Sequence, residues 1–152
     1  MKYTQGKIGR IFVVKFEDGD NLLKELIKLA KKERVESGII HLIGALEKAE
    51  IVVGPEKVEI PPTAIWKNFD DGREVLGLGT IFWKGGEPKI HIHSCIGRED
   101  KVNIGCIRKC AEVYLVIEAV IIEIDTGSNA NVARKFDGQS GLDLIYIEDA
   151  DK

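Results

Sequence analysis

The residues of this sequence best suited to chemistry are two histidines separated by one residue, His91 and His93. Residues two apart on a β-strand point to the same face and lie about 6.6 Å apart along the backbone. Two imidazoles in that arrangement can chelate one transition-metal ion, and zinc normally takes three or four ligands drawn from His, Cys, Asp and Glu. The pair therefore predicts part of a metal site. The spacing alone leaves open the alternative, two histidines on a sheet face without a metal.

Few other side chains in the sequence could complete such a site. His41 is the remaining histidine, and a hydrogen-bonded core histidine is its simpler interpretation. Cys106 is a better candidate, because thiolate is a good zinc ligand and the chain around it could return to the histidine strand. Cys95 shares the histidines' face, but three residues spanning about 13 Å of extended strand cannot easily bind one ion. Cys95 and Cys110 are interpreted as small core side chains.

Two further polar features have both a functional and a plain structural interpretation. Glu118 lies in a strongly apolar segment and could orient a histidine or act as a base beside metal-bound water. A carboxylate satisfied by a neighbouring strand or subunit is the alternative. Four lysines near one face of the first helical segment could meet phosphates, but the acidic chain favours a solvated helix face. They are Lys24, Lys28, Lys31 and Lys32.

Composition bounds the class of protein in which these residues must act. The 152 residues, 44% of them hydrophobic and 31% charged, are ordinary for a single globular domain over residues 1–152. A domain of this size buries roughly 68–70% of its unfolded surface, so it can fold without a metal or disulfides. The net charge of -3 excludes a strongly basic nucleic-acid binder. Three cysteines within a short stretch indicate reduced thiols, and the lack of a signal-like or membrane-spanning run favours the cytoplasm.

The elements that must position the candidate ligands are mainly strands. Hydrophobic periodicity predicts one amphipathic helix over residues 21–34, and residues 100–111 fit neither period, which indicates a loop or short helix. The order indicates an α+β domain with a largely antiparallel sheet and one N-terminal helix. A polar turn is expected over 125–131 and an acidic frayed end after the last strand. Strands are expected over residues 8–16, 35–53, 64–69, 75–83, 89–96, 112–124 and 142–146.

Several of these segments match one known family. The most specific match is Gly-Glu-Pro-Lys-Ile-His-Ile-His at 86–93, which follows the pattern Gly-x-Pro-x-x-His-x-His. The other matching segments are residues 9–11, 37–40, 43–45, 96–100, 111–113 with Glu118, and the tail at 134–137 and 141–142. On these segments together, the sequence resembles the PPC family, the plants-and-prokaryotes conserved domain, over nearly the whole chain.

The resemblance implies an α+β sheet domain that assembles as a homotrimer and holds a metal, most simply zinc, at His91 and His93. Members often carry Gly-Gly-His after the histidine strand, where this chain has Ile104-Gly105-Cys106. The resemblance therefore implies that Cys106 replaces the third histidine, with His41 as a compensating ligand. DNA association, known for plant members with AT-hooks, is the second expectation, although this sequence has no Arg-Gly-Arg-Pro core. A small metal-dependent enzyme is the third, and a non-enzymatic role is favoured over it.

Overall fold

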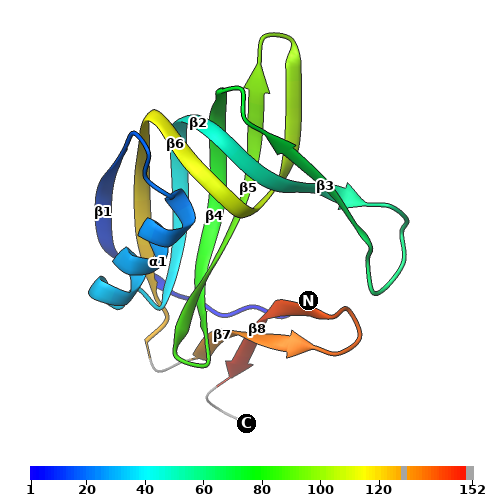
Figure 1. Cartoon of the computed structure of the whole chain (residues 1–152). Coiled ribbons are helices and arrows are strands. Elements are labelled where there is room, and N and C mark those ends of the chain that lie inside the picture. The colour runs from blue at the N-terminus through cyan, green and yellow to red at the C-terminus, as the bar shows by residue number, and fades with distance from the viewer. Residues whose placement is uncertain (128–129, 150–152) are drawn as a thin grey trace.

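The computed structural model describes residues 1–127 and 130–149, in which strands dominate and one short helix is present. The fold is therefore largely β, with the antiparallel sheet that the sequence predicts (Figure 1). The acidic end expected at 150–152 lies outside the described residues. The elements are β1 (Lys7–Glu17), α1 (Leu22–Glu33), β2 (Ser37–Pro55), β3 (Ala64–Phe69), β4 (Arg73–Lys84), β5 (Glu87–Arg98), β6 (Lys101–Asp125), β7 (Ala130–Asp137) and β8 (Leu142–Asp149).

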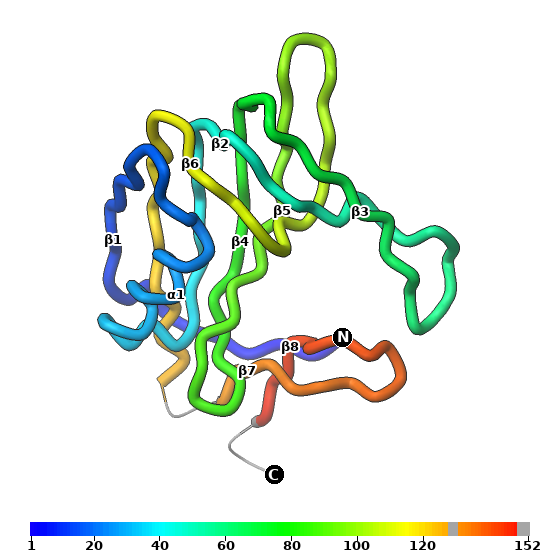
Figure 2. The backbone as a smooth tube through the Cα atoms, viewed as in Figure 1, coloured from blue at the N-terminus to red at the C-terminus, as the bar shows by residue number. Residues whose placement is uncertain are grey.

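The main sheet has six strands in the order β1-β6-β5-β4-β2-β3, all paired antiparallel. Strands β2 and β6 also pair directly with each other, so the ladder β2-β4-β5-β6 closes on itself. Closure removes the free edges of these four strands. The tube in Figure 2 shows β6 bending across the top of the molecule to reach β1, β5 and β2.

Helix α1 begins and ends where local chemistry favours it. The side chain of Asn21 accepts a hydrogen bond from the Lys24 amide at 3.1 Å and so caps the N-terminus. Arg34 adopts a left-handed conformation after the last turn, and the Val35 amide then donates to the carbonyl of Ala30. The indole of Trp83 donates to the Val35 carbonyl at 2.7 Å, which ties the end of the helix to β4.

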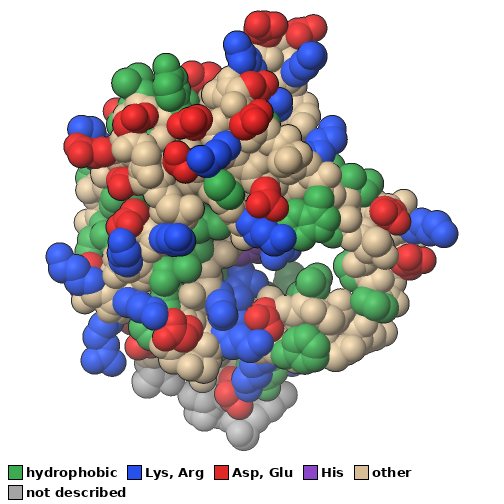
Figure 3. Space-filling model, in the orientation of Figure 1, with side chains coloured by type: hydrophobic (Ala, Val, Ile, Leu, Met, Phe, Trp, Pro, Cys, Tyr) green, Lys and Arg blue, Asp and Glu red, His purple; other side chains and the backbone are tan. Residues whose placement is uncertain are grey.

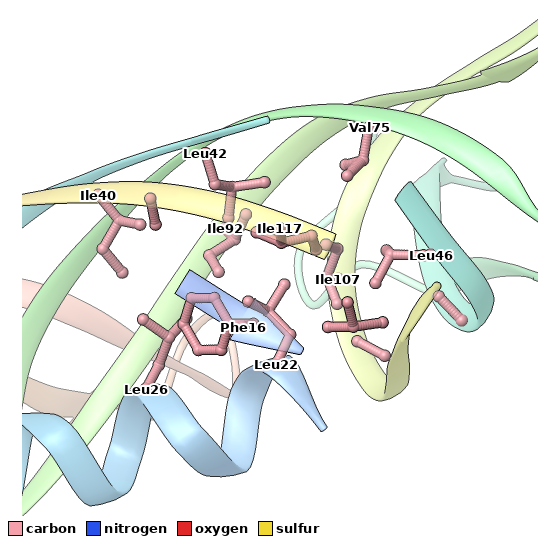
Figure 4. Close-up of a cluster of buried hydrophobic side chains, with 14 of the residues drawn as sticks. Phe16, Leu22, Leu26, Ile40, Leu42, Leu46, Val75, Ile92, Ile107 and Ile117 are labelled. Atoms are coloured by element: carbon pink, nitrogen blue, oxygen red, sulfur yellow. The ribbon is translucent and has the colours of Figure 1, made fainter. Parts of the chain in front are cut away.

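The hydrophobic core lies between α1 and the inner face of the closed sheet (Figure 4). Leu22 and Leu26 project from the helix and are fully buried against the strands. Burying one such side chain contributes about 1.5–3 kcal/mol, so this layer supplies stability without a metal. The sheet residues of the layer include Phe16, Ile40, Leu42, Leu46, Ile92, Ile107 and Ile117.

The loop or short helix expected over 100–111 is wrong, because residues 101–111 form the first part of β6. Val102 and Ile104 on its outer face are 61% and 65% exposed, whereas Ile107 is buried on the inner face. Apolar side chains therefore stand on both faces, and the alternation that usually reveals a strand is missing. The inner face of this part of β6 is covered by the core, whereas its outer face is exposed.

The polar turn expected over 125–131 is also too long at its C-terminal end. Residues 130–137 form β7, which pairs with β8 in a separate two-stranded sheet. Charged residues within β7 hide its strand character. The hairpin lies beside the end of the main sheet that carries the β4–β5 turn, as Figures 1 and 2 both show.

No helix among the described residues could span a membrane, because α1 is too short and too polar to cross a bilayer.

Gly44 tests how far the fold depends on the close approach of β2 and β6. It has a φ of +138°, and a Cβ there would lie 2.2 Å from the Val116 carbonyl oxygen. Gly54 has a similar φ of +147° with nothing within 4 Å. We expect Gly54→Ala to cost about 1–3 kcal/mol through backbone strain alone. Gly44→Ala should cost clearly more, because the methyl group overlaps backbone. Urea denaturation of both variants measures the difference, and equal losses would contradict the packing argument.

Candidate metal centre

Three potential ligands converge at the end of the β5–β6 ladder that lies away from the turn at Arg98 and Lys101. The ligand atoms of His91, His93 and Cys106 all lie within 4.8 Å of one another. The Nε2 atoms of the two histidines are 3.1 Å apart, and the rings meet edge to face. Around a tetrahedral zinc ion, neighbouring ligand atoms lie about 3.3–3.6 Å apart, given bonds of 2.0–2.3 Å. The cluster thus has the donor types of a zinc site with three protein ligands. The histidine pair is close to the required spacing, and the cluster must contract by about 1 Å to surround an ion.

Strand pairing brings these residues together. His93 lies directly opposite Cys106 in the antiparallel β5–β6 register, and directly paired residues project from the same face. His91 follows on that face of β5, opposite Thr80 of β4. Cys106 is in turn paired with Val52 of β2. The predicted geometry of the His-x-His pair is therefore present in the structure, and the sulfur reaches it from the neighbouring strand.

Cys106 is well placed but is not part of the main hydrophobic core. Its side chain is 3% exposed, yet it stands apart from the buried cluster beneath the sheet. Burial raises the pKa of the Cys106 thiol, and the charges of Arg108 and Arg134 partly oppose this. Its Sγ donates to the carbonyl oxygen of Ile107 at 3.8 Å, and a hydrogen bond with the backbone of Ile92 acts against the rise in pKa. A bound cation would stabilise the thiolate that burial disfavours.

His91 is held in the neutral form that ligates metals. Burial lowers its pKa from 6.5 to about 4, assisted by the positive charges of Arg134, His93 and Arg108. A neutral imidazole keeps a lone pair free for coordination, so His91 needs no deprotonation near neutral pH. His93 is the exposed member of the pair. The two rings therefore connect a half-buried position to the outer surface of the sheet.

The other sequence candidates lie elsewhere on the sheet. His41 is exposed and pairs with Leu78, which pairs with His93 on its other side, so two strand spacings separate the two histidines. Among the described residues, the three-ligand cluster does not include His41, whose role as a ligand stays a prediction. Glu118 is exposed and lines the same hollow as His41 and His93.

The interpretation of the remaining cysteines needs one correction. Cys95 is exposed on the outer face and is not a core side chain, whereas Cys110 is half-buried. Cys95 lies on the same face of β5 as His91 and His93, as its spacing predicts. That face carries exposed apolar side chains and is uncovered. All three cysteines are free thiols, as expected.

The cations beside the cluster were not predicted from the sequence. Arg108, Arg134 and Lys89 line a cavity together with His91. Arg134 comes from β7, whose strand was not expected, and Arg108 from the part of β6 expected to be loop or helix. Their only signal was positive charge spread over segments whose structure could not be assigned.

The chain is thus a small β domain. It combines a closed antiparallel sheet and one helix with a His/His/Cys cluster on two adjacent strands. The chain belongs to the Plants and Prokaryotes Conserved (PCC) domain family, whose model matches residues 3–125. The family expected from the sequence motifs is thereby confirmed.

Solved structures agree over almost the full length. A plant- and prokaryote-conserved protein from Pyrococcus horikoshii is 26% identical, with a TM-score of 0.82 over 96% of this chain and 97% of that one. A metal-containing protein from Archaeoglobus fulgidus is 23% identical, with a TM-score of 0.81 over 96% and 99%. A proposed DNA-binding protein from Bacteroides thetaiotaomicron is 20% identical, with a TM-score of 0.75 over 93% and 96%. Among curated proteins, none matches this chain.

The lowered pKa of His91 predicts a pH dependence of stability in metal-free protein. Between pH 6.5 and about 4 the unfolded chain binds a proton at this position and the folded chain does not. The free energy of unfolding should therefore fall as the pH drops through this window, and the effect should be absent above it. In His91→Gln the slope should be shallower by at most about one proton. Denaturant titrations from pH 8 to pH 4 test this. Parallel curves for both proteins would contradict the burial of a neutral imidazole.

Proposed function

We propose that the protein is a metal-binding PPC-domain assembly protein that holds zinc or a similar divalent transition metal through His91, His93 and Cys106. The observation that carries the proposal is the convergence of three good zinc ligands from two strands within 4.8 Å. The fold of the metal-containing archaeal protein supports it. Since the core is large enough to fold without metal, the ligand set serves function or assembly.

The donor types favour zinc over the harder cations. Imidazole and thiolate suit zinc and related transition metals, whereas calcium and magnesium prefer oxygen ligands. Replacement of the family's third histidine by Cys106 makes the set softer but keeps it suitable for zinc. His41 is the proposed additional ligand from the sequence, and its distance across β4 means that it needs a rearrangement or a second chain to reach the cluster.

A small metal-dependent enzyme is a weaker proposal for the same residues. Three protein ligands leave one coordination position, as in catalytic zinc sites, where the metal acidifies a bound water. The chain's own contribution would be to hold His91 neutral and to line the adjoining cavity. Glu118 as the base receives little support, because it pairs with Ile43 of β2, and β2 and β4 lie between it and the histidine strand.

Metal analysis tests the site. Protein purified without a histidine tag should contain near-stoichiometric zinc, and the His91→Ala/His93→Ala variant should lose it. Cys106→Ser should weaken binding by more than the roughly 10–100-fold that loss of a supporting residue costs. With Co²⁺ in place of zinc, Cys106→Ser should also lose the thiolate charge-transfer band.

Cys95→Ser is the matched control, because it removes an exposed thiol near the site, and it should change neither the metal content nor the band. His41→Ala shows whether His41 contributes. Equal metal content in all variants would end the proposal.

We further propose that the outer sheet face mediates the homotrimer that the family resemblance implies. Val13, Leu76 and Ile104 on this face are 87%, 61% and 65% exposed. Together with neighbouring Leu78, Ile43 and Val120 they form a hollow of about 590 Å³ that polar groups barely interrupt. Contiguous apolar surface of this kind marks association sites on water-soluble domains. A second and third copy of the chain are the occupants we propose.

Charge placed on this face should break the assembly. We expect Val13→Glu and Leu76→Glu to dissociate the trimer, because each buries an unpaired carboxylate at the interface. Val58→Glu is the control, since Val58 is fully exposed outside the face. Light scattering coupled to gel filtration gives the masses. A wild-type monomer, or a trimer in all three variants, would refute the proposed interface.

DNA association receives less support than metal binding. The structural relatives described as proposed DNA-binding proteins are 20% identical. Two of the helix lysines are engaged in ion pairs, Lys28 with Glu25 and Lys31 with Glu87. The solvated-face interpretation of the helix therefore fits better than a phosphate-binding surface.

A further inference from the structure

A second cavity adjoins the metal cluster on the side away from the apolar hollow. It measures about 500 Å³ and lies between β4, β5 and β6 of the main sheet and the β7–β8 hairpin. His91 forms part of its wall. The space-filling view shows a hollow between the sheet and the hairpin with a histidine side chain inside it and Lys and Arg side chains around it (Figure 3). The volume falls within the range of pockets for small molecules.

The lining of this cavity is strongly cationic although the chain as a whole is acidic. Lys84, Lys89, Arg108 and Arg134 line it, and the acidic side chain of the lining is Asp143. His91 adds no charge near neutral pH. The cavity thus concentrates positive charge in a chain with a net charge of -3. Such focusing raises the local concentration of anions and speeds their entry.

Some of these cationic side chains form ion pairs or hydrogen bonds within the residues that the structure describes, and others do not. Lys84 forms an ion pair with Asp143. The terminal nitrogens of Arg134 donate to the Asp143 carbonyl at 3.0 Å and to the Thr80 hydroxyl at 3.2 Å. These contacts fasten the hairpin to the sheet, and they fix the guanidinium in place. Arg134 is therefore an ordered wall of the cavity.

Three groups remain without a partner. The Nε of Arg134 is buried and has no hydrogen-bond partner, which is a costly state for a cationic donor. Arg108 and Lys89 form no ion pair or hydrogen bond within the described part of the chain. Arg108 keeps its full set of donors, the planar arrangement that suits phosphate and carboxylate oxygens. The side chains of Arg108 and Lys89, from β6 and β5, therefore line the cavity without an ion-pair partner among the described residues, beside the ordered guanidinium of Arg134.

We propose that this cavity is a binding site for a small oxyanion, a phosphate- or carboxylate-bearing ligand held by Arg108, Arg134 and Lys89 beside the metal centre. Charge-assisted hydrogen bonds to a half-buried guanidinium are stronger than those between neutral groups. The ligand neutralises part of the surplus charge carried by Arg108, Lys89 and Arg134. The site does not require the metal, but an oxyanion there lies next to the residues that would hold it.

The position of the site explains why the histidine motif alone does not reveal it. Arg134 and Asp143 lie beyond residue 125, outside the segment matched by the family model. The hairpin that carries them lies over the sheet beside His91 and forms one wall of the cationic cavity.

Calorimetric titration with inorganic phosphate and with succinate tests the site. We use wild-type protein in both its metal-loaded and its EDTA-treated form, so that a failure of metal binding is scored separately. Arg108→Gln and Lys89→Gln remove exposed, unpaired cations and should fold normally. Lys101→Gln is the control, because it removes the same charge from the distant β5–β6 turn. The stronger of the two probes identifies the preferred oxyanion.

We expect saturable binding by the wild type and the control, weakened at least about tenfold in Arg108→Gln, which corresponds to about 1.4 kcal/mol. Lys89→Gln should show a smaller loss in the same direction. Binding that survives EDTA treatment supports the site whether or not the metal proposal holds. No saturable binding of either probe, or equal affinities in Arg108→Gln and Lys101→Gln, would overturn the proposal. Binding lost only on metal removal would also overturn it, since the metal itself would then be the receptor.

Discussion

The register of β5 against β6 is the constraint on which the rest of this structure depends. The turn that pairs Arg98 with Lys101 sets His93 opposite Cys106. Because side chains alternate between faces, a slip of one residue would carry the cysteine to the core face and leave the histidines without a third ligand. The same β6 then continues along β2 and β1, so one long strand fixes both the site and the closure of the sheet. Gly105 permits that course, since a Cβ there would lie 2.7 Å from the Val52 carbonyl oxygen.

Electrostatics around the site are arranged by burial more than by net charge. His91 stays neutral because it is half-buried among cations, and Arg134 stays in place because its terminal nitrogens bridge the hairpin and the sheet. These features create a local field opposite in sign to the charge of the whole chain. Net charge influences the solubility of a protein and its nonspecific binding, whereas the chemistry of a site depends on the few groups that face it.

The two faces of the sheet explain both the stability of the monomer and its expected assembly. The inner face is covered by α1 and forms the core, while the outer face carries many apolar side chains that are uncovered in the single chain. One row of paired residues crosses this outer face from Val13 through His41 to His93 and Cys106. Assembly on that face would therefore alter the surroundings of the exposed His93. The proposed metal binding and the proposed association would then be coupled through a shared surface.

The sequence by itself determined the family, most strands, the amphipathic helix and the His-x-His pair, because each depends on local spacing or on a contiguous motif. It also singled out Cys106. It could not place residues 101–111 or 130–137, since apolar residues on both faces or charges along the strand erase the alternation that reveals a strand. Only the tertiary structure decided that Cys106 meets the histidines while His41 stands two strands away, and that Arg108 and Arg134 enclose a cavity with them. Those contacts join residues far apart in the chain, and their distances follow from strand register and closure, which no local pattern encodes.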